Sequence, residues 1–249
     1  MAWYHKGRRD SYESGQSHNA SHGFASKEGV GVMKLVERVD AVPLATAELL
    51  LRHGARKVRT AAIAERAGIT ESTLFRQYGN LEKVWTATDA WCWGEVTKQV
   101  ARASFGSPQM DARRILLQDT AAIWEMRDDP DLRVAATCAL LFMRRKQAFD
   151  LTENSKAQVE FERRIDTLCQ RIALDDGLSP ECGSTVAQLI LNYMASVWLT
   201  WATMHFGSDD ITTAHDLTAD EAQMGIAVLV SHEYLRRSGA SSTDVDETT

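Results

Sequence analysis

The sequence predicts an all-α protein of about nine helices, and three observations lead to this prediction. Of the 249 residues, 44% are apolar but only four are proline, a composition that suits a globular and mostly helical chain. Apolar residues recur at spacings of three and four along most of the chain after residue 32. The stretch 58–85 divides into two short helical segments separated by a tight turn.

The two ends of the chain are predicted to be disordered. Residues 1–31 are rich in Gly, Ser, His and Asn and have neither a helical nor a strand period. Residues 239–249 form an acidic tail that is rich in Ser and Thr. The folded part is therefore expected to begin near residue 32 and to end near residue 238.

The first helix is expected within 32–52, where Leu35, Val39 and Val42 begin an apolar face. Gly54 follows at the position where a helix ends. Pro43 lies inside this range, and proline is favoured at the first helical position, so the alternative is a helix that begins there.

A short helix over 60–67, a turn at Gly68 and a second short helix from Thr70 to Tyr78 come next. Gly68 is suited to the positive φ that closes the first of these helices, and Thr70 is suited to cap the second. Leu74 and Tyr78 form an inner face on the second helix, and the positions between them are mostly polar. The major groove of DNA accepts such a helix, but an ordinary helical corner in a core remains the alternative.

Three segments carry a resemblance to a known family. They are Leu49–Gly54, the run IAERAGI at 63–69, and the run STLFRQY at 72–78. Together they resemble the amino-terminal domain of the TetR (tetracycline repressor) family. The resemblance implies a three-helix, helix-turn-helix DNA-binding domain over 32–80 and a larger helical domain for ligand binding and dimerisation over 81–238.

The resemblance also implies which side chains meet DNA. Arg76 is suited to guanine, Gln77 to adenine or a phosphate, and the short hydroxyl side chains to phosphates or base edges. Glu71 either accepts from a cytosine amine or complements the helix dipole. The expected DNA-binding residues are Arg59, Thr60, Thr70, Glu71, Ser72, Thr73, Phe75, Arg76, Gln77, Tyr78 and Lys83.

Two residues depart from the family pattern. Phe75 stands where a tyrosine usually offers its hydroxyl, and Leu81 stands where a lysine is common, although Lys83 follows two residues later. Both changes remove phosphate contacts, and each lost contact lowers the salt dependence of binding by about one unit of log–log slope.

Charge is distributed unevenly along the chain. The whole protein has a formal net charge of −6, whereas residues 42–84 contain seven Lys or Arg against four Asp or Glu. This segment is therefore +3 and the remainder −9, which favours one docking surface over general adhesion to polyanions.

Beyond residue 80 we expect a long helix over 81–105 that is capped by Asn80 and ended by Gly106 and Pro108. The Asp-Asp-Pro sequence at 128–130 marks a stop and restart. The other expected helices cover 109–127, 131–137, 139–174, 179–206 and 218–237. For the long helix over 139–174, a break near 152–155 is the alternative.

The resemblance implies a small-molecule site inside this helical domain. Aromatic and soft side chains suit a hydrophobic or planar effector, although each of them is also common as core filler. Asn192 and His205 are polar residues on an apolar helix, and a hydrogen-bonded amide or a surface histidine is the alternative for them. The expected ligand-binding residues are Trp85, Trp91, Trp124, Phe142, Met143, Asn192, Tyr193, Met194 and Trp198.

The last two helices have a broad apolar surface, for which there are two uses. One is the core of a monomer. The other, implied by the resemblance, is a four-helix homodimer interface, which would let two reading helices bind a palindromic operator.

Several classes of function are excluded or disfavoured. No run of about 20 apolar residues is available to span a membrane, and no signal-peptide core begins the chain, so we expect a cytoplasmic protein. Cys92, Cys138, Cys169 and Cys182 lack metal-ligand spacing and are expected to be core thiols, with thiol sensing as the alternative. No hydrolase, metalloprotease or phosphate-loop motif is present, and the acidic cluster near His215 and Asp220 is interpreted as helix capping. No enzyme activity, metal or cofactor is predicted.

The sequence therefore predicts a ligand-responsive DNA-binding transcriptional regulator, a repressor that a small molecule releases from its operator. The alternative is an interaction protein that keeps the helix-turn-helix but has lost operator binding.

Overall fold

A computed structural model describes residues 40–104, 111–144, 155–205, 219–231 and 234. This part of the chain contains nine α-helices and two 3₁₀ turns and no β-strand, as the all-α prediction requires. The helices are α2 (Ala41–His53), α3 (Thr60–Arg66), α4 (Glu71–Tyr78), α5 (Leu81–Ala103), α6 (Ala112–Glu125), α7 (Pro130–Arg144), α8 (Lys156–Asp175), α9 (Pro180–His205) and α10 (Ala219–Leu229).

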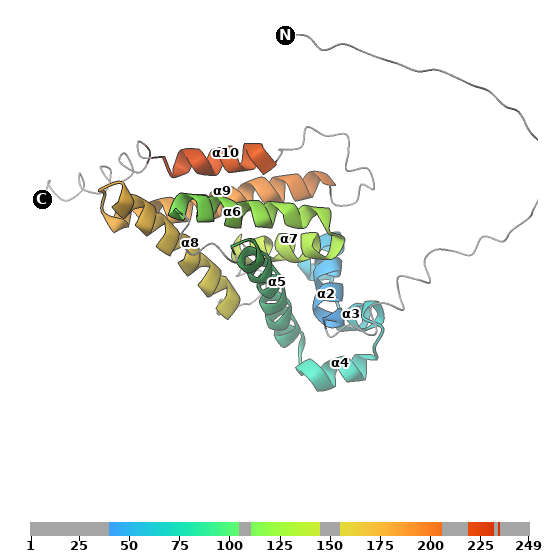
Figure 1. Ribbon diagram of the computed structural model, residues 1–249. Helices are drawn as coiled ribbons and strands as arrows, with labels where there is room; N and C mark the ends of the chain where they lie inside the picture. The colour runs from blue at the N-terminus through green and yellow to red at the C-terminus, as the bar shows by residue number, and fades with distance from the viewer. Residues whose placement is uncertain (1–39, 105–110, 145–154, 206–218, 232–233, 235–249) are drawn as a thin grey trace, which may run out of the picture.

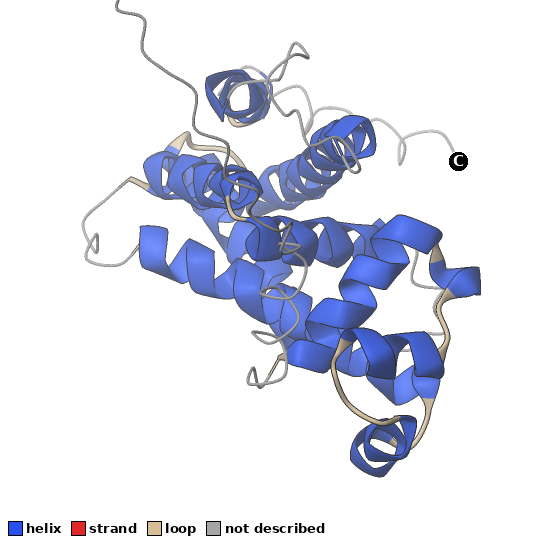
Figure 2. Ribbon diagram, turned by 90° about the vertical axis from the view of Figure 1, so that its right-hand side faces the viewer, coloured by secondary structure: helices blue, strands red, loops and turns tan. Residues whose placement is uncertain are grey.

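The helices α2, α3 and α4 form a small head at one end of the molecule (Figure 1). The helices α5 to α9 form the body, and α10 lies along its outer side. Figure 2, seen from the side, keeps the same order, with α10 at the top and α4 at the bottom. The surface presented by α4 and the body around α10 are therefore at opposite ends of the protein.

Side-chain caps fix where several helices begin. The Thr70 hydroxyl accepts the backbone N–H of Thr73 at 3.2 Å, and the Asn80 side chain accepts that of Lys83 at 2.9 Å. Both caps were predicted from the sequence and are confirmed. Asp111 and Ser155 cap α6 and α8 in the same way. Each cap satisfies an N–H group that has no partner inside its own helix.

Three helix boundaries differ clearly from the prediction, and one of them is the end of the last helix, which was expected over 218–237 but stops at Leu229. The first described helix, which was expected within 32–52 or from Pro43, begins at Ala41 with Asp40 as its N-cap. The expected break between residues 137 and 139 is wrong, because α7 runs unbroken from Pro130 to Arg144. The Thr137 hydroxyl donates to the Arg133 carbonyl at 2.7 Å, so this β-branched residue is accommodated within the helix.

Other expectations fall on residues outside the described part. They concern the arm at 1–31, the tail at 239–249, the helix end at 106–108, the break near 152–154, the His205 side chain and the acidic cluster near residue 215. The restart after the Asp-Asp-Pro sequence is confirmed, since a 3₁₀ turn at Met126–Asp128 precedes the first residue of α7.

The head is joined to the body by buried contacts of α2 with α5 and α7. The Cys138 thiol on α7 donates to the Ala47 carbonyl on α2 at 3.6 Å. Trp85 of α5 packs edge-to-face on Phe142 of α7, with ring centroids 6.4 Å apart. A displacement of α7 would therefore reach the head directly through α2, and it would also act on the start of α5, where the body joins the head.

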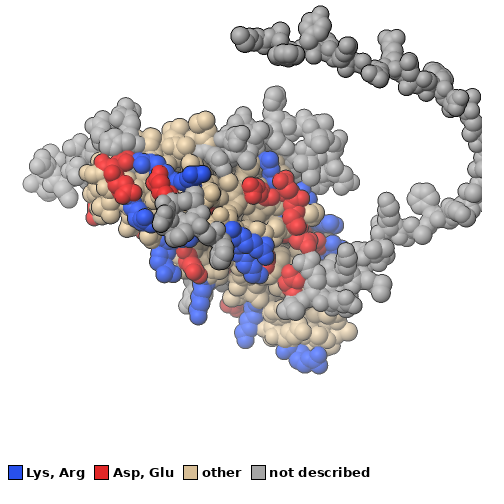
Figure 3. All heavy atoms as spheres, in the orientation of Figure 1, with Lys and Arg blue, Asp and Glu red and all other residues tan. Residues whose placement is uncertain are grey.

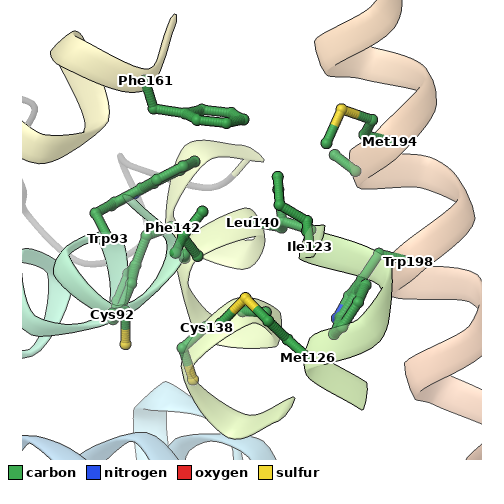
Figure 4. Close-up of a cluster of buried hydrophobic side chains, with 14 of the residues drawn as sticks. Cys92, Trp93, Ile123, Met126, Cys138, Leu140, Phe142, Phe161, Met194 and Trp198 are labelled. Atoms are coloured by element: carbon green, nitrogen blue, oxygen red, sulfur yellow. The ribbon is translucent and has the colours of Figure 1, made fainter. Parts of the chain in front are cut away.

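All four cysteines are buried and free, which confirms that they are core thiols. Cys92 and Cys138 lie in the cluster of buried side chains that Figure 4 shows. Burial raises the pKa of the Cys92 thiol well above its ordinary value, because a buried thiolate would lose its hydration.

Among the described residues, no helix combines the length and the hydropathy that crossing a membrane requires.

Candidate nucleic-acid interface and internal cavity

The turn between α3 and α4 has the predicted geometry. Gly68 has a φ of 70°, the left-handed conformation that glycine adopts without strain. The Ile69 N–H donates to the Ala64 carbonyl at 2.9 Å and closes the end of α3. The turn thus fixes the angle at which α4 leaves α3.

The helix α4 has an inner and an outer face. Leu74 is 1% exposed and Tyr78 is half-buried, and burial raises the pKa of the Tyr78 hydroxyl. Ser72 and Arg76, four residues apart and on the opposite side of the helix, are both exposed. Ser72 and Arg76, which are predicted to meet DNA, therefore point to solvent, whereas Leu74 packs on the head.

Phe75 and Leu81, the two departures from the family pattern, have different environments. Phe75 is 44% exposed on the outer side of α4, where its ring is available to a thymine methyl group or a deoxyribose. Leu81 is half-buried and packs against the core at the start of α5. Leucine at this position thus contributes to packing.

The hydroxyl groups at the start of α4 form a local network. Thr70 Oγ1 lies 2.9 Å from both Ser72 Oγ and Thr73 Oγ1, in addition to its capping bond. Thr70 is thereby committed mainly to the helix end. Ser72 is exposed and Thr73 is half-buried.

Glu71 has a partner that the sequence did not indicate. The Thr60 hydroxyl at the start of α3 donates a hydrogen bond to the Glu71 carboxylate at the start of α4. This bond ties the two helix N-termini together and gives Glu71 a structural role beside its position near the helix dipole. Arg66 is also occupied within the head, since its guanidinium pairs with Glu48 at 2.6 Å, a bond that raises its pKa.

The connector between α2 and α3 supplies exposed cations. Arg59 donates to the Arg56 carbonyl at 3.0 Å and keeps its guanidinium at the surface. No side-chain hydrogen bond caps the N-terminus of α3, where the Glu71 carboxylate accepts the Thr60 hydroxyl. The exposed cations of the head and its junction are Arg52, Arg56, Lys57, Arg59, Arg76 and Lys83.

Figure 3 shows one face of the charge distribution. Lys and Arg lie at the lower tip of this face, over α4, whereas over the body they are mixed with Asp and Glu. The lower tip therefore has the positive potential that a polyanion favours.

A small cavity lies inside the body, between α6, α7, α9 and α10. Figure 4 shows Ile123, Leu140 and Trp198 converging from the first three of these helices. The space available to the centre of a water-sized sphere is about 20 Å³. The cavity is lined by Thr120, Ile123, Trp124, Leu140, Tyr193, Met194, Val197, Trp198 and Ile226.

Four of the residues expected to bind a ligand line this cavity, namely Trp124, Tyr193, Met194 and Trp198. The other five lie elsewhere. Trp85 and Phe142 form the buried edge-to-face pair at the head–body junction. Trp91 on α5 and Met143 on α7 are half-buried. Asn192 is exposed and accepts a hydrogen bond from Arg144 at 3.3 Å.

Five lining residues were not anticipated from the sequence: Thr120, Ile123, Leu140, Val197 and Ile226. Helical spacing could have identified the first two, because they share a face of α6 with Trp124. Ile226 required knowledge of where α10 packs, which no local pattern contains.

Comparison with known proteins agrees with this architecture. Residues 44–85 match the family model described as bacterial regulatory proteins of the tetR family. No match was found among curated protein sequences. The matched segment covers α3 and α4 completely, together with most of α2 and the start of α5.

Solved structures share the fold over most of their length. A TetR-like transcriptional regulator from Rhodococcus sp. RHA1 is 16% identical, with a TM-score of 0.54, and the match covers 77% of this chain and 92% of that one. A putative TetR-family transcriptional regulator from Rhodococcus sp. is 15% identical, with a TM-score of 0.56, and the match covers 77% of this chain and 97% of that one. The fatty acid degradation regulator FadR from Bacillus halodurans is 14% identical, with a TM-score of 0.53, and the match covers 78% of this chain and 92% of that one. At these identities the structures show a shared fold.

Proposed function

Since this chain carries the TetR-family DNA-binding domain on a body of TetR-like fold, we propose that it is a ligand-responsive transcriptional repressor. In this proposal a homodimer occupies a palindromic operator, and a hydrophobic or aromatic small molecule releases it. Such a regulator of transcription is not an enzyme.

The exposed polar face of α4 is the observation that carries the DNA-binding part of the proposal. Arg76 has the fork of donors that guanine O6 and N7 accept, and Ser72 lies beside it on the same face. The residues proposed to read base edges are Ser72, Thr73, Phe75, Arg76 and Gln77.

Phosphate contacts are proposed for the rim of this face. Arg59 and the uncapped N-terminus of α3 lie on one side, and Lys83 lies on the other at the start of α5. Thr60, Thr70, Glu71 and Tyr78 are proposed to hold these elements in position, because their side chains are bonded or packed within the head. Phosphate contacts fix the register of the head on DNA, whereas base contacts give specificity.

A homodimer is proposed because one reading helix contacts only a few base pairs. Two heads bound one DNA turn apart, roughly 34–36 Å, read a palindromic site. The body has an apolar surface that suits self-association: Leu189 on α9 is 37% exposed, and Met224 and Val228 on α10 are 66% and 55% exposed. Large exposed apolar side chains that lie together mark such surfaces.

The effector is proposed to bind in the cavity between α6, α7, α9 and α10. Apart from Thr120, its described lining is aromatic and aliphatic, and no Asp, Glu, Lys, Arg or His is among the described lining residues. Burying a charged ligand among such side chains without a partner would be costly, so a neutral molecule is favoured.

Release requires the effector to bind a body conformation with a different head spacing. A tenfold loss of operator affinity needs about 1.4 kcal/mol of differential effector binding between the two conformations. The described route for this coupling is α7, which contacts the cavity through Leu140 and the head through Cys138.

Selection of genomic fragments with the purified protein, followed by gel-shift titration at about 150 mM salt, tests the proposal. Sequence-specific retardation that a hydrophobic compound abolishes would support a repressor with an effector. Equal affinity for selected and random DNA would favour the alternative of an interaction protein without an operator, which the exposed Phe75 and the acidic Glu71 on the reading face motivate.

A further inference from the structure

The cavity is too small for the effector that the proposed function requires. Its 20 Å³ provides room for about one water molecule, which needs roughly 10–15 Å³ by this measure. A small organic molecule therefore fits only if at least one wall of the cavity moves. The structure of the walls indicates which one.

Three of the four wall helices are cross-braced by polar bonds or close backbone contact. The Trp198 indole N–H on α9 donates to Thr137 Oγ1 on α7 at 2.9 Å, and both groups are buried. On α6, the fully buried Asp119 pairs with Arg164 of α8 at 2.6 Å. The Trp198–Thr137 bond is buried at both ends, and the Asp119–Arg164 pair has its carboxylate fully buried, so breaking either bond leaves a buried polar group without a partner.

The packing of α9 on α8 is equally restrictive. A Cβ atom added at Gly183 of α9 would lie 2.5 Å from the Cys169 carbonyl oxygen of α8. The two backbones are therefore in direct contact, and α9 has no room to move towards α8. The walls formed by α6, α7 and α9 are consequently held in place.

The fourth wall helix, α10, is described with its side chains from Met224 to Leu229, and none of these six residues has a polar side chain that could form a brace. Among these described side chains, Ile226 is the one that lines the cavity, and α10 packs mainly on α6 and α9. In both Figure 1 and Figure 2 it lies on the outer side of the body. The residue after its end is held by Arg113, whose Nε donates to the Val230 carbonyl at 3.2 Å.

Arg113 acts as a bridge at this point. Its Nη2 also pairs with Asp176 in the turn between α8 and α9, a bond that raises the pKa of the guanidinium. One side chain on α6 thus joins the end of α10 to the rest of the body. The bridge is partly exposed, so it costs less to open than the Trp198–Thr137 bond, which is buried at both ends.

Gly225 sets how closely α10 approaches the cavity. A Cβ atom added at this glycine would lie 2.2 Å from the hydroxyl oxygen of Tyr193, a residue of the cavity wall. Any larger residue would displace either α10 or the tyrosine ring. The closed position of α10 therefore depends on this contact.

We propose that α10 is a lid that opens to admit the effector, and that the Tyr193–Gly225 contact and the Arg113 bridge hold it closed. The inference rests on the proposed effector response, because it identifies how a ligand enters that cavity. Opening moves Ile226 away and enlarges the cavity without breaking the Trp198–Thr137 or Asp119–Arg164 bonds.

The entry of a neutral fluorescent probe, N-phenyl-1-naphthylamine, tests the lid by stopped-flow mixing with the full-length protein in the absence of DNA. Gly225→Ala and Arg113→Met should each increase the association rate by about tenfold, which corresponds to ~1.4 kcal/mol in favour of the open lid. Gly94→Ala and Arg114→Met are matched controls, since Gly94 has open space beside it and Arg114 is an exposed neighbour. Both controls should bind the probe at the wild-type rate.

Hydrogen exchange gives a second measurement that needs no ligand. Amides of residues 224–230 should exchange through a local opening, at lower free energy than those of α9, and Gly225→Ala should increase their exchange. If the amides of α10 exchanged only through global unfolding of the protein, the lid proposal would be overturned.

The outcomes separate the two proposals. Probe binding at one rate in wild type and both variants overturns the lid and leaves the effector cavity standing. Absence of probe binding in every variant overturns both the cavity and its lid, whereas operator binding in a gel shift is measured independently and decides the DNA-binding proposal.

Discussion

Arg76 is the residue whose loss should affect sequence recognition most. It is exposed on the outer face of α4 and can donate two hydrogen bonds to a guanine. Arg76→Ala should weaken operator binding by about 1–3 kcal/mol and relax the preference at one base pair. Fluorescence anisotropy with operator and random DNA measures both effects.

The control for Arg76 is Arg163→Ala, which removes the same charge from an exposed position on α8. It should leave operator affinity nearly unchanged. Equal losses of operator and random-DNA binding in Arg76→Ala would show a phosphate contact instead of a base contact.

The hydrogen bond between Trp198 and Thr137 should contribute to stability. Thr137→Val keeps the shape of the side chain but leaves the buried indole N–H without its acceptor, at a cost of about 1–3 kcal/mol. Urea unfolding measures this loss. Thr86→Val, at an exposed position on α5, is the control and should change stability little. A loss as small as that of the control would mean that the indole finds another partner.

The cysteines should be unreactive in the folded protein. Burial raises the pKa of Cys169 from 9.0 to about 12, so the folded state favours the neutral thiol. This contribution to stability is present below pH 9 and is lost as the pH rises towards about 12. Ellman's reagent at about pH 8 should label few thiols natively and all four in denaturant. The alkaline loss of stability should be smaller in Cys169→Ala, and rapid native labelling of Cys169 would contradict its burial.

At the scale of a helix, Asn80 fixes where α5 begins and thus how the body leaves the head. Asn80→Ala should lower the free energy of unfolding by about 0.5–2 kcal/mol, because the Lys83 N–H loses its acceptor. Asn80→Asp retains an acceptor and should remain near wild type. Thermal unfolding of the three proteins compares them, and an alanine variant as stable as the aspartate variant would show that the cap contributes nothing.

The elements that sequence predicted well are those defined by local chemistry. Thr70, Asn80 and Gly68 act on neighbours within a few residues, so their roles follow from residue type and spacing. The exposed face of α4 was predictable for the same reason, since Leu74 and Tyr78 define its inner side.

The elements that sequence predicted poorly depend on tertiary contacts. The break expected after Thr137 is absent, because burial and the bonds of Thr137 to Arg133 and Trp198 keep this β-branched residue within α7. Of the nine expected ligand residues, five lie away from the cavity, because an aromatic residue on an apolar face fills core as readily as it lines a pocket. The Thr60–Glu71 bond joins two helices and has no local signal.

Across the whole molecule, the cavity and the reading helix are connected through α7. One side of this helix faces the cavity through Leu140 and accepts the Trp198 hydrogen bond through Thr137. The next residue, Cys138, contacts the Ala47 carbonyl of α2. A shift of α7 when the cavity is filled would therefore change the position of the head, as the proposed release requires.

The helix α10 has apolar side chains on two sides, which links the proposed lid to the proposed dimer. Ile226 and Val230 are buried against the body, whereas Met224 and Val228 are exposed. Val228→Glu should place a charge in the proposed dimer interface and convert the dimer into a monomer. Sedimentation velocity measures the change, and operator affinity should fall with it, because a single head contacts only half of the palindrome.

Val159→Glu is the matched control, since Val159 is exposed on α8 and outside this surface. It should remain dimeric with wild-type operator affinity. If Val228→Glu remains a dimer, the copies associate through another surface, and α10 is free to open without disturbing the partner. If the dimer dissociates, an effector that displaces α10 must weaken dimerisation, and dimerisation must weaken effector binding by the same factor, because binding free energies at linked sites are reciprocal.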